Sequence, residues 1–217
     1  MKITLKFEFM LVLLGVLMCL PMVASAHERQ AFEINGEQYL FIVGSLGEPV
    51  VVDDKTGTDL RVFKADPNDV GNSSAEGAEP VEGLEESLKV IMSADGQSRE
   101  MDLATVYGQV GAYKTLFFPT KSTQLTYTIV GELNGVDIEL PFTCEFGDHV
   151  MSAGHDHGQE TEILDDNVSR IFQSGSFTCP REKAPLGFPV DSASVADTQG
   201  MLSSLVSVVQ QLLQKLI

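Results

Sequence analysis

From residue 27 onward, the chain is cut into short segments of alternating apolar and polar residues, separated by Gly, Asp, Asn and Pro. Two of the breaks are Asn-Gly pairs, Asn35-Gly36 and Asn134-Gly135. Asn-Gly tolerates the positive φ that a type I′ hairpin turn requires at both central positions. We find no helical crossovers of the kind a parallel sheet needs. The pattern predicts a mainly β fold, an immunoglobulin-like antiparallel β-sandwich over residues 27–143. The expected strands are Ala31–Ile34, Gln38–Val43, Pro49–Val52, Asp59–Phe63, Ser87–Met92, Arg99–Ala104, Ala112–Phe118, Gln124–Val130 and Val136–Phe142.

The first 26 residues have the features of a secretory signal peptide. Lys2 and Lys6 precede an apolar run from Phe9 to Leu20, and Ala24-Ser25-Ala26 supplies the small residues of a cleavage site. The run is shorter than the roughly 20 residues that span a bilayer, so an uncleaved anchor is the lesser alternative. We therefore expect an exported protein whose mature chain begins at His27. It would be periplasmic or extracellular, and association with the cell envelope stays open.

The charge of the chain restricts its partners. There are 14 basic and 31 acidic residues, a net charge of −17. Loss of residues 1–26 removes two lysines and one glutamate, which leaves 12 basic and 30 acidic residues and a net charge of −18. A surface this acidic repels phosphate backbones, which excludes nucleic acid as a partner.

All four histidines lie in the mature chain: His27 at its start, and His149, His155 and His157 within nine residues. Cleavage after Ala26 would place a free α-amine beside the His27 imidazole, and these two nitrogens can chelate one metal ion. Imidazole and thioether donors suit copper or zinc. The candidate ligands are His27, His149, Met151, His155 and His157, with copper as the first choice and zinc as the alternative. The competing interpretation of residues 148–157 is a solvent-exposed polar loop whose histidines bind metal only adventitiously.

Two cysteines remain after cleavage, Cys144 and Cys179. In an exported protein such a pair predicts a disulfide, here one that would anchor the histidine-containing segment from residue 144 to residue 190. The rival assignment is a pair of thiolate ligands for copper.

Residues 191–217 end in apolar positions at helical spacing: Leu202, Leu205, Val209, Leu212 and Leu216. We expect an amphipathic C-terminal helix. Three uses of its apolar face stay open: docking on the sandwich, pairing with a second copy or with an envelope protein, and contact with a membrane surface. The acidity of the chain favours the first two over contact with anionic lipid.

Motifs of catalysis are absent from the sequence. It contains no G-x-S-x-G, no H-E-x-x-H and no glycine-rich phosphate loop, and its acidic clusters are typical of solvated surface. We do not expect an enzyme.

Several short motifs resemble a family of small exported copper-handling domains, the CopC type. The residues that carry the resemblance are His27-Glu28-Arg29, Gly111-Ala112-Tyr113, Phe118-Pro119-Thr120 and Tyr127, and it covers about residues 27–143. It implies an immunoglobulin-like sandwich with a copper site at the mature N-terminus, in which only His27 is carried over as a ligand. The segment 144–190 and the terminal helix depart from the family.

These observations favour an exported copper-binding protein that acts as a carrier or chaperone. The alternative is a metal-free interaction or assembly module that uses the sandwich and the C-terminal helix.

Overall fold

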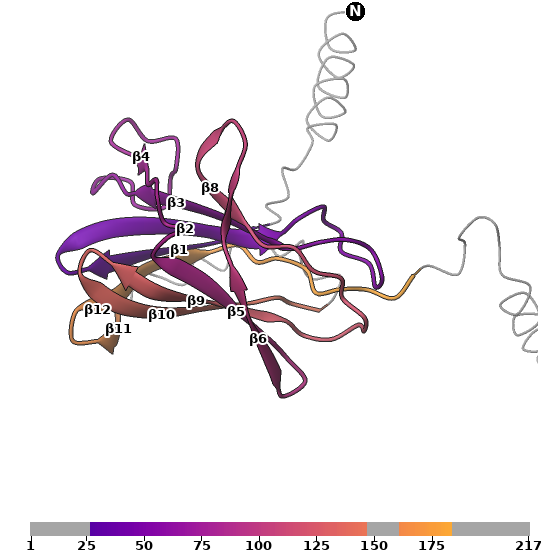
Figure 1. The fold of residues 1–217 in the computed structure, drawn as a ribbon. Helices are drawn as coiled ribbons and strands as arrows, with labels where there is room; N and C mark the ends of the chain where they lie inside the picture. Colours follow the sequence, from indigo (N-terminus) through magenta and orange to yellow (C-terminus); the bar gives the residue numbers. More distant parts are fainter. Residues whose placement is uncertain (1–26, 147–160, 184–217) are drawn as a thin grey trace, which may run out of the picture.

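The computed structural model describes residues 27–146 and 161–183, which form two antiparallel sheets (Figure 1). The larger sheet has the order β11-β12-β1-β2-β3-β8-β7, and β4 pairs with β3 beside this path. Its strands are β1 (His27–Ile34), β2 (Glu37–Ser45), β3 (Thr58–Lys64), β4 (Glu79–Pro80), β7 (Ala104–Val106), β8 (Gln109–Lys114), β11 (Glu162–Asp165) and β12 (Val168–Ser174). The smaller sheet has the order β10-β9-β5-β6. Its strands are β5 (Leu88–Ala94), β6 (Gln97–Asp102), β9 (Thr126–Leu133) and β10 (Val136–Thr143).

One hydrophobic core joins the two sheets. Phe32 and Phe41 from the larger sheet meet Phe142 from the smaller sheet, with ring centroids 5.7–6.5 Å apart. Tyr127 of β9 is fully buried in the same core and stacks on Phe177. Alternate residues of each strand face this core, because successive side chains point to opposite faces of a sheet. The prediction of a mainly β fold with antiparallel sheets around a core is confirmed.

A second, smaller apolar cluster lies on the opposite face of the larger sheet. It contains Ala31, Leu40, Ile42 and Ala65, with Phe172 and Val70 packed against them. Val70 belongs to the long connection after β3, which therefore packs over part of this face. We call this face the outer face of the larger sheet, since it points away from the shared core.

Both predicted Asn-Gly turns are confirmed. Asn35 and Gly36 have φ values of 51° and 78°, and Asn134 and Gly135 have 53° and 75°. The two turns also hold each other: the Asn35 side-chain amide donates to the Asn134 carbonyl, and the Asn134 amide donates to the Ile34 carbonyl, both at 3.1 Å. Two hairpins from different sheets are thus joined at one end of the molecule.

The segment from Cys144 to Val190 differs from the sequence prediction of a loop. Within it, β11 and β12 form a hairpin, and β12 pairs with β1 along the edge of the larger sheet (Figure 1). The alternation of β12 is concealed because Arg170 and Gln173 are polar and hydrogen-bond to polar residues of β1. Another expected strand, Pro49–Val52, is reduced to a single bridge between Val51 and Arg181.

The expected signal peptide and C-terminal helix lie outside the described residues. Within residues 27–146 and 161–183, no helix is long and apolar enough to cross a membrane.

Candidate metal site

His27, the predicted N-terminal ligand, is the first residue of β1. It pairs with Gly44 of β2, and Gly44 pairs in turn with Asp59 of β3. The His27 ring reaches across β2, and its Nε2 lies 3.1 Å from Oδ2 of Asp59. The two side chains are 27% and 15% exposed, so both are partly shielded from solvent. With a hydrogen on Nε2, the imidazole donates to Asp59 and carries its lone pair on Nδ1.

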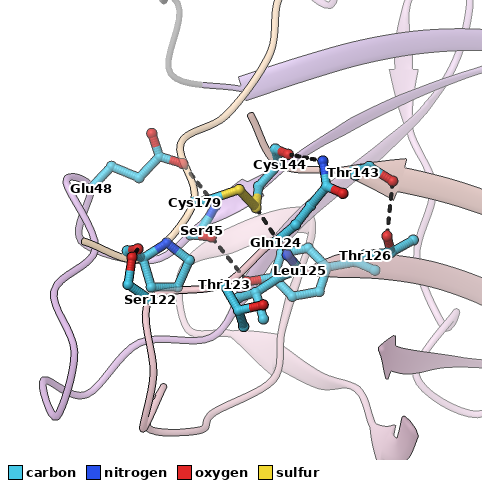
Figure 2. Close-up of a disulfide and its surroundings, with 12 residues drawn as sticks. Ser45, Glu48, Ser122, Thr123, Gln124, Leu125, Thr126, Thr143, Cys144 and Cys179 are labelled. Atoms are coloured by element: carbon cyan, nitrogen blue, oxygen red, sulfur yellow. Dashed lines mark hydrogen bonds between the residues drawn. A yellow bond between two sulfur atoms is a disulfide. The ribbon is translucent and has the colours of Figure 1, made fainter. Parts of the chain in front are cut away.

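Further charged groups surround this pair. Arg61 Nη2 lies 3.7 Å from the same Asp59 oxygen. The Glu48 carboxylate accepts a hydrogen bond of 3.1 Å from the Ser45 backbone N–H (Figure 2). Burial raises the pKa of Glu48 above its ordinary value, and the Asp59 charge adds to this, while the Ser45 hydrogen bond and the His27 charge oppose it. Glu48 is therefore within electrostatic range of both members of the pair, and two carboxylates favour a cation here.

A buried polar cluster lies directly behind the pair, on the core side of β1. Glu28 is 5% exposed, and its Oε1 accepts hydrogen bonds from the side-chain amides of Gln30 at 2.6 Å and Gln173 at 2.8 Å. Arg170 donates to the Gln30 side-chain oxygen at 3.1 Å. Burial is the largest cause of a raised Glu28 pKa; the two amides and Arg170 oppose it, and Glu145 adds to it. The cluster fixes β12 against β1 beside the start of β1.

The raised Glu28 pKa predicts a pH-dependent stability. A raised native pKa means that the protonated form stabilises the fold, and this contribution is lost as pH rises through that pKa. Glu28→Gln keeps an oxygen for both amide donors and carries no charge. We expect its free energy of unfolding to exceed that of the wild type at pH 7 and the two to converge at acidic pH. Urea unfolding between pH 4.5 and 7.5 measures this, with Glu33→Gln on the exposed face of β1 as the charge control. A Glu28→Gln variant that is less stable at pH 7 would contradict the prediction.

The Cys144–Cys179 disulfide is confirmed. It joins the residue after β10, in the smaller sheet, to the segment that follows β12, in the larger sheet. Figure 2 shows it between Ser45 and Glu48 on one side and Gln124 and Leu125 on the other. Backbone hydrogen bonds reinforce it, because Glu145 N–H donates to the Phe177 carbonyl and Cys179 N–H donates to the Glu145 carbonyl. The assignment of these cysteines as thiolate ligands is wrong for this structure.

The other predicted ligands, His149, Met151, His155 and His157, lie outside the described residues, as do Leu202, Leu205, Val209, Leu212 and Leu216 of the expected helix. Before this gap the structure describes the chain up to Phe146, two residues beyond Cys144 and three before His149.

No group of three or more His, Cys, Asp or Glu side chains in the described parts of the chain is arranged to hold a metal ion. The α-amine of a chain that begins at His27 would add a nitrogen donor, since the amine and Nδ1 of one N-terminal histidine close a six-membered chelate ring. This donor set of nitrogen with nearby carboxylate oxygen fits Cu(II) or Zn(II).

Sequence reasoning gave Glu48 no role and did not connect Asp59 with His27. Asp59 is the first residue of an expected strand and the last of the acidic cluster Asp53–Asp59, for which a turn is the first interpretation and a cation site the lesser one. The register of β1 against β2 follows from the Asn35-Gly36 turn, but the register of β2 against β3 is set across a connection of residues 46–57. No local signal in the sequence gives that second register.

Comparison of the chain with protein-family models, with curated proteins and with solved structures gave no match.

Proposed function

We propose that this protein is exported, begins at His27 after removal of residues 1–26, and binds copper there as a carrier or chaperone. The observation that carries the proposal is the 3.1 Å contact between His27 Nε2 and Asp59. Histidines that bind metals characteristically donate their other ring N–H to a carboxylate, which fixes the tautomer and the ring orientation. Asp59 stands in that relation to His27, with Nδ1 and the new α-amine as the metal-binding nitrogens.

The surroundings support a cation at this position. Asp59 and Glu48 bring two carboxylates near the imidazole, and the net charge of the whole chain attracts cations in general. The segment with His149, Met151, His155 and His157 is tied to the sandwich through Cys144. His149 follows Cys144 by five positions, and a chain of that length spans at most about 17 Å. We propose that one or more of these side chains completes the coordination, with zinc as the alternative metal.

The finer fold assignment belongs to the same proposal. Two antiparallel sheets and a histidine at the start of the first strand support an immunoglobulin-like sandwich of the CopC type. The β11–β12 hairpin and residues 184–217 would be additions to that plan. Export is supported by the disulfide, because structural disulfides persist in oxidising compartments.

Two forms of the chain test the N-terminal site. One begins at His27, and the other keeps Val23 to Ala26, so that the α-amine is four residues away from the imidazole. We expect Cu(II) and Zn(II) to bind the first form at least about 100-fold more tightly, since loss of even an outer-shell partner weakens metal binding 10- to 100-fold. Isothermal titration at pH 7.4 measures both affinities. Binding should weaken on acidification, because the metal competes with protons for both nitrogens.

The N-terminus of the secreted protein and the comparison of the two affinities decide the outcome. Mass spectrometry of the protein secreted by its native signal should give a chain that starts at His27. Equal affinity in both forms would move the site to the histidine-containing segment, and no binding in either form would overturn the proposal.

A further inference from the structure

Gly44 lies between the two side chains that form the candidate metal site. It is the cross-strand partner of His27 on one side and of Asp59 on the other, and it is buried. Adjacent strands lie about 4.8 Å apart, so the backbones of β1 and β3 are about 10 Å apart here. The His27 and Asp59 side chains close that distance to a contact of 3.1 Å. They must therefore meet over Gly44, on the outer face of the larger sheet.

The neighbouring positions of β2 on this face are filled differently. Side chains two residues apart in a strand share a face, so Ile42 and Leu40 follow Gly44 on the outer face. Both are buried in the small apolar cluster with Ala31 and Phe172. In the row of Ile42 the flanking residues are Arg29 and Arg61, one on each neighbouring strand. A side chain thus separates the flanking residues in that row, whereas Gly44 itself contributes only hydrogen at the corresponding place.

We propose that Gly44 is a positioning residue of the metal site: its missing side chain leaves the space in which the His27 imidazole and the Asp59 carboxylate meet. A Cβ at this position would point from the outer face into the line between the two groups. The imidazole would then lose the carboxylate that fixes its tautomer, and Nδ1 would no longer be held for the chelate. This inference rests on the proposed N-terminal metal site and identifies what sets its geometry.

A double-mutant cycle tests the proposal in the mature chain that begins at His27. Gly44→Ala and Asp59→Ala should each weaken Cu(II) binding by about 10- to 100-fold, the usual effect of losing an outer-shell partner. Because both act through one hydrogen bond, Gly44→Ala/Asp59→Ala should bind no more weakly than the weaker single variant. Effects that multiply, or wild-type affinity in Gly44→Ala, would overturn the assignment.

A second readout needs no metal. Long-range ¹H–¹⁵N spectra of metal-free protein report the tautomer of His27, which should be protonated on Nε2 in the wild type and a mixture in both single variants. If the wild type binds no copper, the proposed function fails, while this spectrum still decides the role of Gly44. An unchanged His27 tautomer in Gly44→Ala would overturn that role.

A loss of folding in Gly44→Ala is also informative. The proposed conflict is between the new methyl group and the His27 ring, so His27→Ala/Gly44→Ala should then recover the fold, measured by thermal unfolding. If the double variant stays unfolded, Gly44 is required by the backbone and the positioning role is wrong.

Discussion

Replacing both Cys144 and Cys179 with alanine should lower the free energy of unfolding by about 3 to 4 kcal/mol. The bridge spans a sequence separation of 35 residues, and closing a loop of that length removes about this much chain entropy from the unfolded state. Alanine is the better replacement than serine because both residues are buried in the shared core, where a serine hydroxyl group would be left unpaired. Urea unfolding of the oxidised wild type and of the variant gives the difference.

The single variants control this measurement. Either substitution alone removes the bridge, so Cys144→Ala or Cys179→Ala should account for most of the loss and the second change should add little. A loss below about 1 kcal/mol would show that the backbone hydrogen bonds around residues 144–145 and 177–179 suffice to hold the two sheets together.

Phe142→Ala should destabilise the protein by about 3 to 5 kcal/mol, the range for truncating a buried phenylalanine. Its ring is fully buried and packs against Phe32 and Phe41, whose ring centroids lie 6.4 and 6.5 Å away. The substitution leaves a cavity between the two sheets that neither sheet can close alone. Urea unfolding is again the measurement, with an unchanged m value as evidence that the same surface unfolds.

Phe118→Ala is the matched control for that variant. Phe118 is 59% exposed, and its loss should change the free energy of unfolding by no more than about 0.5 kcal/mol. Equal effects of the two substitutions would contradict the assignment of a shared core around Phe142.

The strand pattern was predictable wherever alternation was regular and one face was apolar. β5, β9 and β10 overlap the expected segments, and buried residues alternate with more exposed ones along β10 and over most of β9. β2 also overlaps an expected segment, although its residues from Tyr39 to Ser45 are all buried. The edge hairpin β11–β12 was missed for a physical reason. Its inward positions meet Glu28 and Gln30, so polar side chains occupy places where the pattern requires apolar ones. A buried hydrogen-bonded cluster carries no hydrophobic periodicity.

For the candidate site, the residue types could be predicted and the partners could not. His27 follows from the cleavage motif, and the Cys144–Cys179 pair follows from a count of cysteines. Asp59 and Glu48 are acidic residues among many, and nothing local distinguishes them. Only the contact with His27 and the hydrogen bond from Ser45 give them a role.

The sequence by itself determined the two Asn-Gly hairpins and the disulfide. A two-residue Asn-Gly turn fixes the register of its flanking strands, so Asn35-Gly36 already places His27 opposite Gly44. The tertiary structure alone decided that Asp59 lies on the other side of Gly44 and that β12 covers the edge of β1. The connection from Leu46 to Gly57 is too long to fix a register. The pairing of β3 with β2 is instead set by side chains such as Leu60 and Val62, which must reach the same core as β9 and β10.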